Sequence, residues 1–412
     1  MVYKQIVTIA VVFLSVHFVH SQSKLGLNYP MGMPQHGGTG SVLALAGTGV
    51  AIGNDFFGLS ANPANLSVSQ RATFSSSISG DIISLRDTVS DQHYTISLRT
   101  LTLSIPVGRV GTFGVTVEPY SSAAVRHRLN EKLNIDGIFD DSKELAVLSE
   151  GGAINWQVGW GYNIKKVLRV GIAYKRFSFN QTIAAITQMS LTTQSGGKYE
   201  KHLLDSTRTK FATNGIRGGF QLPIKSLTIG LSGEYYFIDK AKGYHFVYGT
   251  RDRDTIENSS RYYYFKPPPS GAVGLSYQFN PQWLVAVDVG MTLWERYYSE
   301  TAPVEELRNA WNVSGGIRFI PAPNLLTPKL YEIMQYRAGV RYTQLPGVNG
   351  TEIAAVIGTG LPMLSNGGMF DIIFEYCRRW DKRYIDYSEN IFSLKLGING
   401  GRKWYQSSDE NY

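Results

Sequence analysis

The sequence is poor in cysteine and in charged residues. One of its 412 residues is a cysteine, Cys377, and 17% are Asp, Glu, Lys or Arg. A single cysteine cannot form an intramolecular disulfide bond, so packing and backbone hydrogen bonds have to stabilise the fold. No segment after Ser21 approaches about 18 uninterrupted apolar residues, which argues against membrane-spanning helices. The 40 basic and 32 acidic residues form no basic stripe, which argues against a nucleic-acid partner.

The sequence also lacks the residue clusters that catalysis or metal binding requires. The histidines that follow Ser21 have no metal-ligand spacing to one another or to the cysteine; they are His36, His93, His127, His202 and His245. His93 and Ser97 are the one local candidate for a nucleophilic pair, but four residues along a strand span about 13 Å, too far for contact. We therefore expect no enzymatic activity, no cofactor and no metal ion.

The N-terminus has the pattern of a secretory signal peptide. Lys4 precedes an apolar run over Ile6–Val19, and small and polar residues follow at Ser21–Ser23. The run is shorter than the roughly 20 residues of a spanning helix. We predict a signal peptide over residues 1–21, with an uncleaved anchor as the alternative.

From about Ala72 onward, apolar and polar residues alternate with a period of two, which indicates β-strands. Every even position of Ile154–Tyr162 is large and apolar or aromatic, and Phe392–Ile398 alternates in the same way. An even number of such segments, about fourteen, fits a closed antiparallel barrel in a bacterial outer membrane. The segments begin near Ala72, His93, Gly111, Gly152, Val167, Thr209, Ser226, Arg261, Gln282, Arg308, Ile333, Thr351, Gly368 and Ser388.

The connections between these segments alternate in length, as in barrels with a periplasmic and an external rim. Short turns are expected at 108–110, 163–166, 223–225 and 280–281. Long polar connections are expected at 126–150, 184–208 and 240–260. A secreted β-sandwich would alternate similarly, but aromatic residues gather near the predicted strand ends, where rings settle at lipid interfaces. We therefore predict an all-β fold, a transmembrane antiparallel β-barrel over residues 72–401 with a polar tail at 402–412.

Residues 22–71 differ from the rest of the mature chain. The alternation disappears there, and glycines and small residues dominate from His36 to Gly53. The glycines at 47, 49 and 53 have the wrong spacing for a dinucleotide fingerprint, and no βαβ pattern follows. A barrel of about fourteen strands has a lumen wide enough to leak. We therefore predict that residues 22–71 form a plug, or hatch, inside the lumen.

The most distinctive local motif is Gly58–Leu66, in which Asn62, Pro63 and Ala64 form an Asn-Pro-Ala sequence. Asn before Pro is suited to a capped turn, since the Asn side chain accepts from following amides and Pro has a preset φ. This motif, placed before about fourteen predicted strands, resembles the FadL/TodX family of outer-membrane transporters for hydrophobic compounds. The resemblance implies a fourteen-stranded barrel whose hatch contains these three residues, and lateral release of long-chain fatty acids or aromatic hydrocarbons. The polar tail departs from barrels that end on an aromatic residue.

The lumen side of the strands is expected to be polar with charges of both signs. Its members include Lys175, Asp288, Asp371, Glu375 and Lys395. Such residues can pair with one another and with the plug. Alternatively, some arginines bind a carboxylate head group, for which the guanidinium fork is suited. The candidates for this contact are Arg318, Arg337 and Arg341.

A transported hydrophobic molecule requires a dry site, and apolar residues away from the lipid face are its candidates. They lie in the plug and in the two expected loops 126–150 and 184–208, where they either bind ligand or only pack the loops. The candidates are Leu43, Leu45, Leu133, Ile138, Phe139, Ile186, Met189 and Leu191.

Three functions stay open on the sequence alone. The first is uptake of long-chain fatty acids or other hydrophobic compounds by passive diffusion through a plugged barrel. The second is docking or shuttling of secreted proteins, as in FadL-like barrels of the Bacteroidetes type that are similar to PorV; the third is an open or structural barrel. Apolar lining would favour transport, and a hydrophilic, sealed interior with a partner-binding external rim would favour docking. The expected partners are hydrophobic small molecules, outer-membrane lipid and lipopolysaccharide, and the expected state is a monomer.

Overall fold

The computed structural model describes residues 29–402, apart from 55, 57, 87–90, 133–137, 194–197, 250–254, 301–306, 326, 347–349, 364–366 and 382–387. The predicted signal peptide and nearly all of the predicted tail therefore lie outside the described residues. No helix among the described residues is long and apolar enough to cross a membrane.

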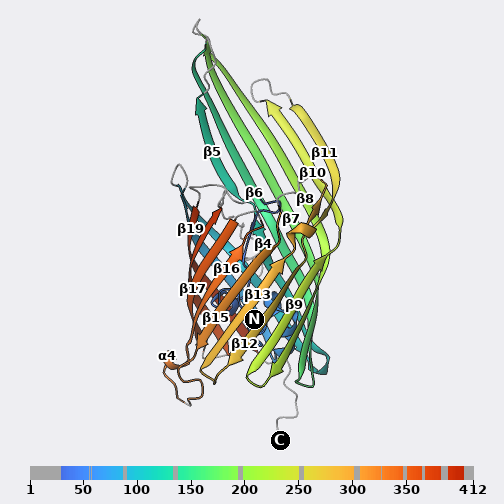
Figure 1. Cartoon of the computed structure of the whole chain (residues 1–412), viewed down its shortest axis with the longest axis vertical. Coiled ribbons are helices and arrows are strands. Elements are labelled where there is room, and N and C mark those ends of the chain that lie inside the picture. The colour runs from blue at the N-terminus through green and yellow to red at the C-terminus, as the bar shows by residue number, and fades with distance from the viewer. Residues whose placement is uncertain are drawn as a thin grey trace, which may run out of the picture.

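Fourteen antiparallel strands close into a barrel, as the alternation predicts (Figure 1). Closure joins the last strand to the first, from the pair Ser388 and Arg86 to the pair Arg402 and Ala72. The wall strands are β2 Ala72–Arg86, β3 Asp91–Val107, β4 Gly111–Ser122, β6 Ile138–Ile164, β7 Leu168–Thr193, β8 Lys198–Ile224, β9 Leu227–Tyr236, β12 Ser270–Gln278, β13 Trp283–Thr292, β15 Ala310–Phe319, β16 Gln335–Gln344, β17 Gly350–Met363, β18 Gly368–Asp381 and β19 Ser388–Arg402.

The two faces of the wall follow the predicted parity. In β6, Trp156 and Val158 are 47% and 52% exposed on the outside, whereas Asn155 and Gln157 are buried inside. Successive side chains of a strand point to opposite faces, so this parity separates a lipid-facing surface from a polar lumen. The predicted fold class is confirmed.

Several strands continue far beyond the rest of the wall on the side opposite the short turns (Figure 1). β6 and β8 have 27 residues each and β7 has 26, against the roughly 9 to 11 that a crossing needs. β5 Val125–Lys132, β10 Asp239–Gly249 and β11 Thr255–Lys266 lie beside them. The pairing order is β5–β6–β7–β8–β10–β11. We call this extension the projecting sheet.

The prediction of long polar connections at 126–150, 184–208 and 240–260 is wrong, because most of these residues belong to the projecting sheet. Beyond the membrane both faces of a sheet meet water, so a strand there does not need an apolar face. Its backbone groups are paired by its neighbours, which a local sequence pattern does not reveal.

The described residues between 29 and 71, which we call the lumen segment, run inside the barrel (Figure 1). They contain β1 Met33–Pro34, α2 Gly40–Leu43, α3 Gly58–Ala61 and the 3-10 turn η2 Pro63–Val68. Short elements elsewhere are η3 Gly108–Val110, η4 Trp294–Arg296, β14 Tyr298–Ser299 and α4 Leu330–Ile333.

Glycines in the wall let the lumen segment approach the barrel backbone. A Cβ added at Gly171 of β7 would lie 2.2 Å from the carbonyl carbon of Pro63, and one added at Gly230 of β9 would lie 2.3 Å from the carbonyl oxygen of Val50. No other residue fits where backbone meets backbone this closely. The lumen segment and the wall are therefore built to fit each other.

Candidate functional site

The Asn-Pro-Ala motif lies where the lumen segment meets β7, β8 and β9. Asn62 is fully buried, and its Oδ1 accepts a hydrogen bond from the amide of Ala64 at 3.0 Å. Its Nδ2 donates to the carbonyl of Val50 at 2.8 Å and to those of Phe220 and Leu231 at 3.2 Å each. Asn62 thus caps η2 and also joins the lumen segment to two wall strands.

Wall side chains bind the backbone of the same segment. Asp288 of β13 accepts hydrogen bonds from the amides of Gly49 at 2.7 Å and Val50 at 2.9 Å. Arg217 of β8 donates to the carbonyls of Ser60 at 2.6 Å and Ala61 at 2.8 Å. These bonds satisfy buried backbone groups of a segment that has little secondary structure of its own.

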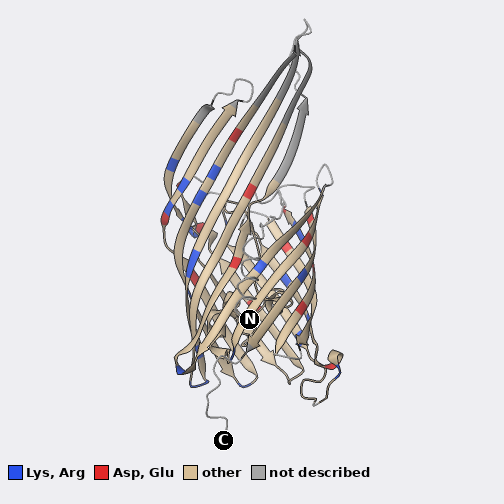
Figure 2. Ribbon diagram, turned by 180° about the vertical axis from the view of Figure 1, so that it is seen from behind, with Lys and Arg blue, Asp and Glu red and all other residues tan. Residues whose placement is uncertain are grey.

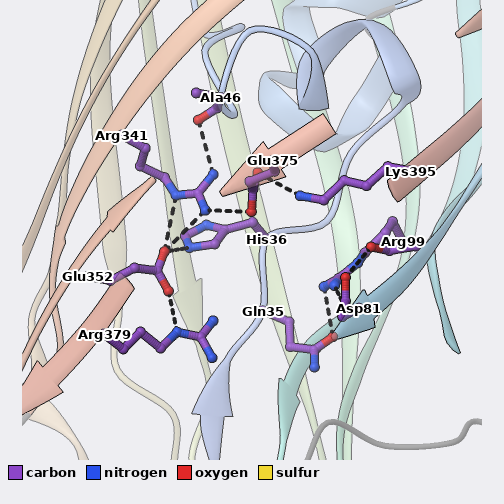
Figure 3. Close-up of polar contacts among 11 residues, drawn as sticks. Gln35, His36, Ala46, Asp81, Arg99, Arg341, Glu352, Glu375, Arg379 and Lys395 are labelled. Atoms are coloured by element: carbon purple, nitrogen blue, oxygen red, sulfur yellow. Dashed lines mark hydrogen bonds and ion pairs between the residues drawn. The ribbon is translucent and has the colours of Figure 1, made fainter. Parts of the chain in front are cut away.

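A cluster of buried charges lies on the opposite part of the wall, on β16 to β19 (Figure 3). Glu352 pairs with Arg341 at 3.1 Å and with Arg379 at 2.6 Å. Glu375 pairs with Lys395 at 2.7 Å and with Arg341 at 3.4 Å. All five side chains are at most 11% exposed. Buried charges persist when each is paired in this way, so the cluster closes this side of the lumen without leaving a free charge.

The lumen segment contributes to this charged cluster. His36 lies 2.9 Å from Glu352 through Nε2, and Gln35 accepts a hydrogen bond from Arg99 at 3.1 Å. The imidazole can donate its Nε2 hydrogen to Glu352 in either its neutral or its protonated form, so the contact does not depend on the charge of His36.

The three arginines predicted to receive a head group differ in their surroundings. Arg341 belongs to the charged cluster, and Arg337 pairs with Asp371 at 2.6 Å with both side chains at most 2% exposed. Arg318 donates to Gln278 at 3.1 Å, and within the described part of the chain its Nε has no hydrogen-bond partner. Two of the three candidates therefore already hold carboxylates of the wall.

The apolar candidates fall into two separate places. Leu43 and Leu45 are each 1% exposed, and Leu45 packs against Gly316 of β15. Ile186 is half-buried on β7 in the projecting sheet, opposite Leu204. Leu133 lies outside the described residues, as do the side chains of the remaining candidates, which are Ile138 and Phe139 on β6 and Met189 and Leu191 on β7.

An aromatic cluster that packs against Met31 of the lumen segment was not predicted from the sequence. Phe177 stacks on Phe211 with ring centroids 5.4 Å apart, and Phe265 lies 5.2 Å from Tyr297. The other large members include Phe179, Tyr236, Tyr263 and Trp294. The alternation of inward and outward residues could have predicted this cluster, because Phe177 and Phe179 lie at inward positions of β7. Apolar rings at inward positions indicate a dry layer in the upper lumen.

The wall is split between β3 and β4. Their pairing runs from Val107 and Gly111 only as far as Leu101 and Val117. Above that point residues 35–38 pass between the two strands, where the amide of Gln35 donates to the carbonyl of Tyr120 at 2.9 Å. A cavity of about 180 Å³ lies here, lined by residues such as Gln35, Leu98, Pro119, Ala153 and Ile154.

No group of residues suited to a metal ion occurs among those that the structure describes. A second cavity, of about 160 Å³, lies between β8 and β15 and is lined mainly by polar groups and glycines. Ligand pockets for drug-sized molecules usually have about 300 to 1,000 Å³, so both cavities are small for a long hydrophobic ligand.

Comparison with known proteins identifies the fold. The family model described as BamG matches residues 1–411. Among solved structures, a Pseudomonas aeruginosa FadL homologue is 13% identical with a TM-score of 0.60, covering 90% of this chain and 100% of that one. The Pseudomonas putida toluene transporter TodX is 14% identical, with a TM-score of 0.56 and coverages of 90% and 100%. The Ralstonia pickettii toluene transporter TbuX is 14% identical, with a TM-score of 0.53 and coverages of 89% and 99%.

No curated protein matches the chain. The structural matches confirm the expected FadL/TodX type of barrel at the level of the fold. A closed barrel of this type is located in the bacterial outer membrane.

Proposed function

The chain belongs to the BamG family, and for this member we propose a docking function: a sealed outer-membrane barrel that binds a protein partner through the edges of its projecting sheet. The observation that carries this proposal is a filled, hydrogen-bonded lumen below a sheet that extends far beyond the membrane. A partner that offers an extended segment can add a strand to such an edge.

The filled lumen favours docking over passage. The lumen segment is bound on one side through Asn62, Arg217 and Asp288 and on the other through the charged cluster. Passage of a molecule requires that these buried bonds break together, and each broken buried bond leaves a group unsatisfied at about 1–3 kcal/mol. The lumen segment is therefore suited to act as a permanent core of the barrel.

The edges of the projecting sheet favour a partner. β5 pairs with β6 along Val125–Lys132, and β11 pairs with β10 from Thr255 to Phe265. On its other edge β11 pairs with β14 at Phe265 and Lys266, and the amide of Glu300 donates to the carbonyl of Tyr264 at 3.3 Å. Among the described strands, β5 and β11 are thus the outermost strands of the projecting sheet. Soluble proteins protect such edges, since an open row of backbone donors and acceptors recruits further strands.

Site-specific photo-cross-linking in the native host tests docking. Ser260 on the edge strand β11 and Arg208 on the interior strand β8 both pair with Tyr244 of β10, so they lie in one cross-strand row on one face. We expect p-benzoyl-phenylalanine at position 260 to form a discrete adduct with another protein and the same probe at position 208 to form none. Absence of an adduct at 260, or equal adducts at both positions, contradicts docking at this edge.

The split between β3 and β4 favours a second candidate, the uptake of long-chain fatty acids or other hydrophobic compounds with lateral release through the wall. Leu98, Ala153 and Ile154 supply apolar lining to the cavity at this split. Binding of oleate and toluene to vesicles that contain the purified protein tests this function. We expect Leu98→Glu to abolish binding if the split is the path. No binding above protein-free vesicles contradicts transport and leaves docking untouched.

A further inference from the structure

The rim formed by the short turns is strongly basic. Six exposed basic residues lie there, and we call them the basic rim: Arg71, Arg109, Lys165, Lys166, Lys225 and Lys329. Among the described turn residues at this end, Glu332 is the single acidic one. Basic residues recur along the turns at the lower end of the barrel (Figure 2). Six basic residues against one acidic residue leave an excess of five positive charges on the described part of this rim.

Three of these lysines occupy backbone positions that disfavour lysine. Lys165 and Lys166 have φ values of 49° and 62° in the three-residue turn between β6 and β7, and Lys225 has a φ of 53° in the two-residue turn between β8 and β9. Two-residue hairpins with positive φ favour Asn-Gly or Gly, because a Cβ is strained there. The presence of lysine at all three positions indicates that the positive charge has a functional role at this rim, which offsets the backbone strain.

The neighbours of the lysines are apolar and face outward. Ile164 and Val167 flank the lysine pair and are 39% and 61% exposed, and Ile224 beside Lys225 is 48% exposed. Exposed aliphatic side chains next to ammonium groups are typical of a segment at the boundary between the acyl chains and the head groups of a membrane. The aliphatic part of each lysine can lie along the apolar layer while its ammonium group reaches the polar layer. A water-facing protein interface would not need this apolar border.

We propose that the basic rim binds the phosphate groups of anionic phospholipids in the periplasmic leaflet and fixes the depth of the barrel in the membrane. Each lysine presents a compact charge to a phosphate, and the apolar neighbours insert into the same leaflet. The ligand chemistry is a diacylglycerol phosphodiester whose negative charge is not compensated by a cationic head group. Soluble phosphate lacks the acyl chain, so it engages the charge but not the apolar border.

Lipid retention by the intact protein tests the proposal. The parent and each variant are equilibrated in micelles that contain equal amounts of phosphatidylglycerol and phosphatidylethanolamine. Native mass spectrometry then gives the ratio of the two lipids that remain bound to the protein. The test variant is K165N/K166G/K225G, which removes three charges and gives each turn a residue that its backbone favours. We expect the phosphatidylglycerol preference to fall by at least about fivefold, the factor expected for the loss of one lysine, while the temperature of unfolding does not fall.

The matched control is R208Q/K242Q/R261Q, which removes three charges from the projecting sheet. We expect the control to keep the lipid ratio of the parent. Three results overturn the proposal: an unchanged ratio in the test variant, an equal fall in both variants, or suppression of the preference by inorganic phosphate alone. Loss of an acidic periplasmic protein from the test variant, with its lipid ratio unchanged, would instead show a protein-binding rim.

Discussion

Replacement of Asn62 is the sharpest test of how the lumen segment is held. Asn62→Ala removes the cap of η2 and leaves the buried amide of Ala64 without its acceptor. The carbonyl of Val50 keeps a hydrogen bond in this variant, since Gln221 also donates to it at 2.9 Å. The cap and the bond to the Ala64 amide are the same interaction, and leaving that buried amide without an acceptor costs about 1–3 kcal/mol, so we expect Asn62→Ala to lower the free energy of unfolding by about this amount.

Asn62→Asp separates capping from anchoring. The carboxylate keeps the acceptor for Ala64 but turns an oxygen toward the carbonyls of Val50, Phe220 and Leu231, where the amide had donated. We expect this variant to be less stable than Asn62→Ala, because a buried charge faces three acceptors. Its planar-bilayer conductance is expected to exceed that of the parent.

Urea unfolding in lipid vesicles and single-channel recording measure the two effects. The matched control is Asn54→Ala, since among the described residues the Asn54 side chain accepts a local bond from the amide of Phe56 at 3.2 Å and no other. We expect this control to lose less than about 1 kcal/mol. An Asn62→Asp variant as stable and as tightly closed as the parent would refute the assignment of Asn62 as an anchor.

Three further predictions concern the wall. Val158→Arg on the outer face is expected to lower the free energy of unfolding in vesicles by about 2–4 kcal/mol, and Val167→Arg at the rim by about 0–1 kcal/mol; equal effects would contradict the placement of the lipid layer. Arg337→Ala leaves the buried carboxylate of Asp371 without its ion-pair partner, so denaturant titration should show that the free energy of unfolding falls by about 3–5 kcal/mol. A fall smaller than that expected for an exposed ion pair would contradict the buried pairing. Lys166→Gly removes strain at positive φ and should raise the stability by about 1 kcal/mol in the same titration, whereas a decrease would show that the lysine stabilises its turn.

The strands of the barrel could be predicted because their signal is local. Each wall strand separates lipid from a polar lumen, so its residues alternate, as in Ile154–Tyr162. The predicted starts at Ala72, Gly111, Gly368 and Ser388 coincide with β2, β4, β18 and β19. Parity also predicted the inward polar residues, and Lys175 and Asp288 are indeed buried.

The projecting sheet could not be predicted by the same means. In β7 the alternation that follows Leu168 weakens beyond Phe179, because water replaces lipid outside and no membrane enforces an apolar face. Strand structure there depends on hydrogen bonds to β6 and β8, whose partners lie at separations from 6 residues, between Thr192 and Lys198, to 55 residues, between Ile138 and Thr193. Propensity alone does not reveal such pairing.

The sequence by itself therefore determined which residues form strands, which face of each strand is polar, and that the N-terminal region differs from the wall. Only the tertiary structure decided the partners of the inward groups. His36 contacts Glu352 across 316 positions of sequence, and Asn62 reaches β8 and β9 more than 150 positions away. Such contacts arise when the barrel closes around the lumen segment, and closure is a property of all strands together that no local pattern encodes.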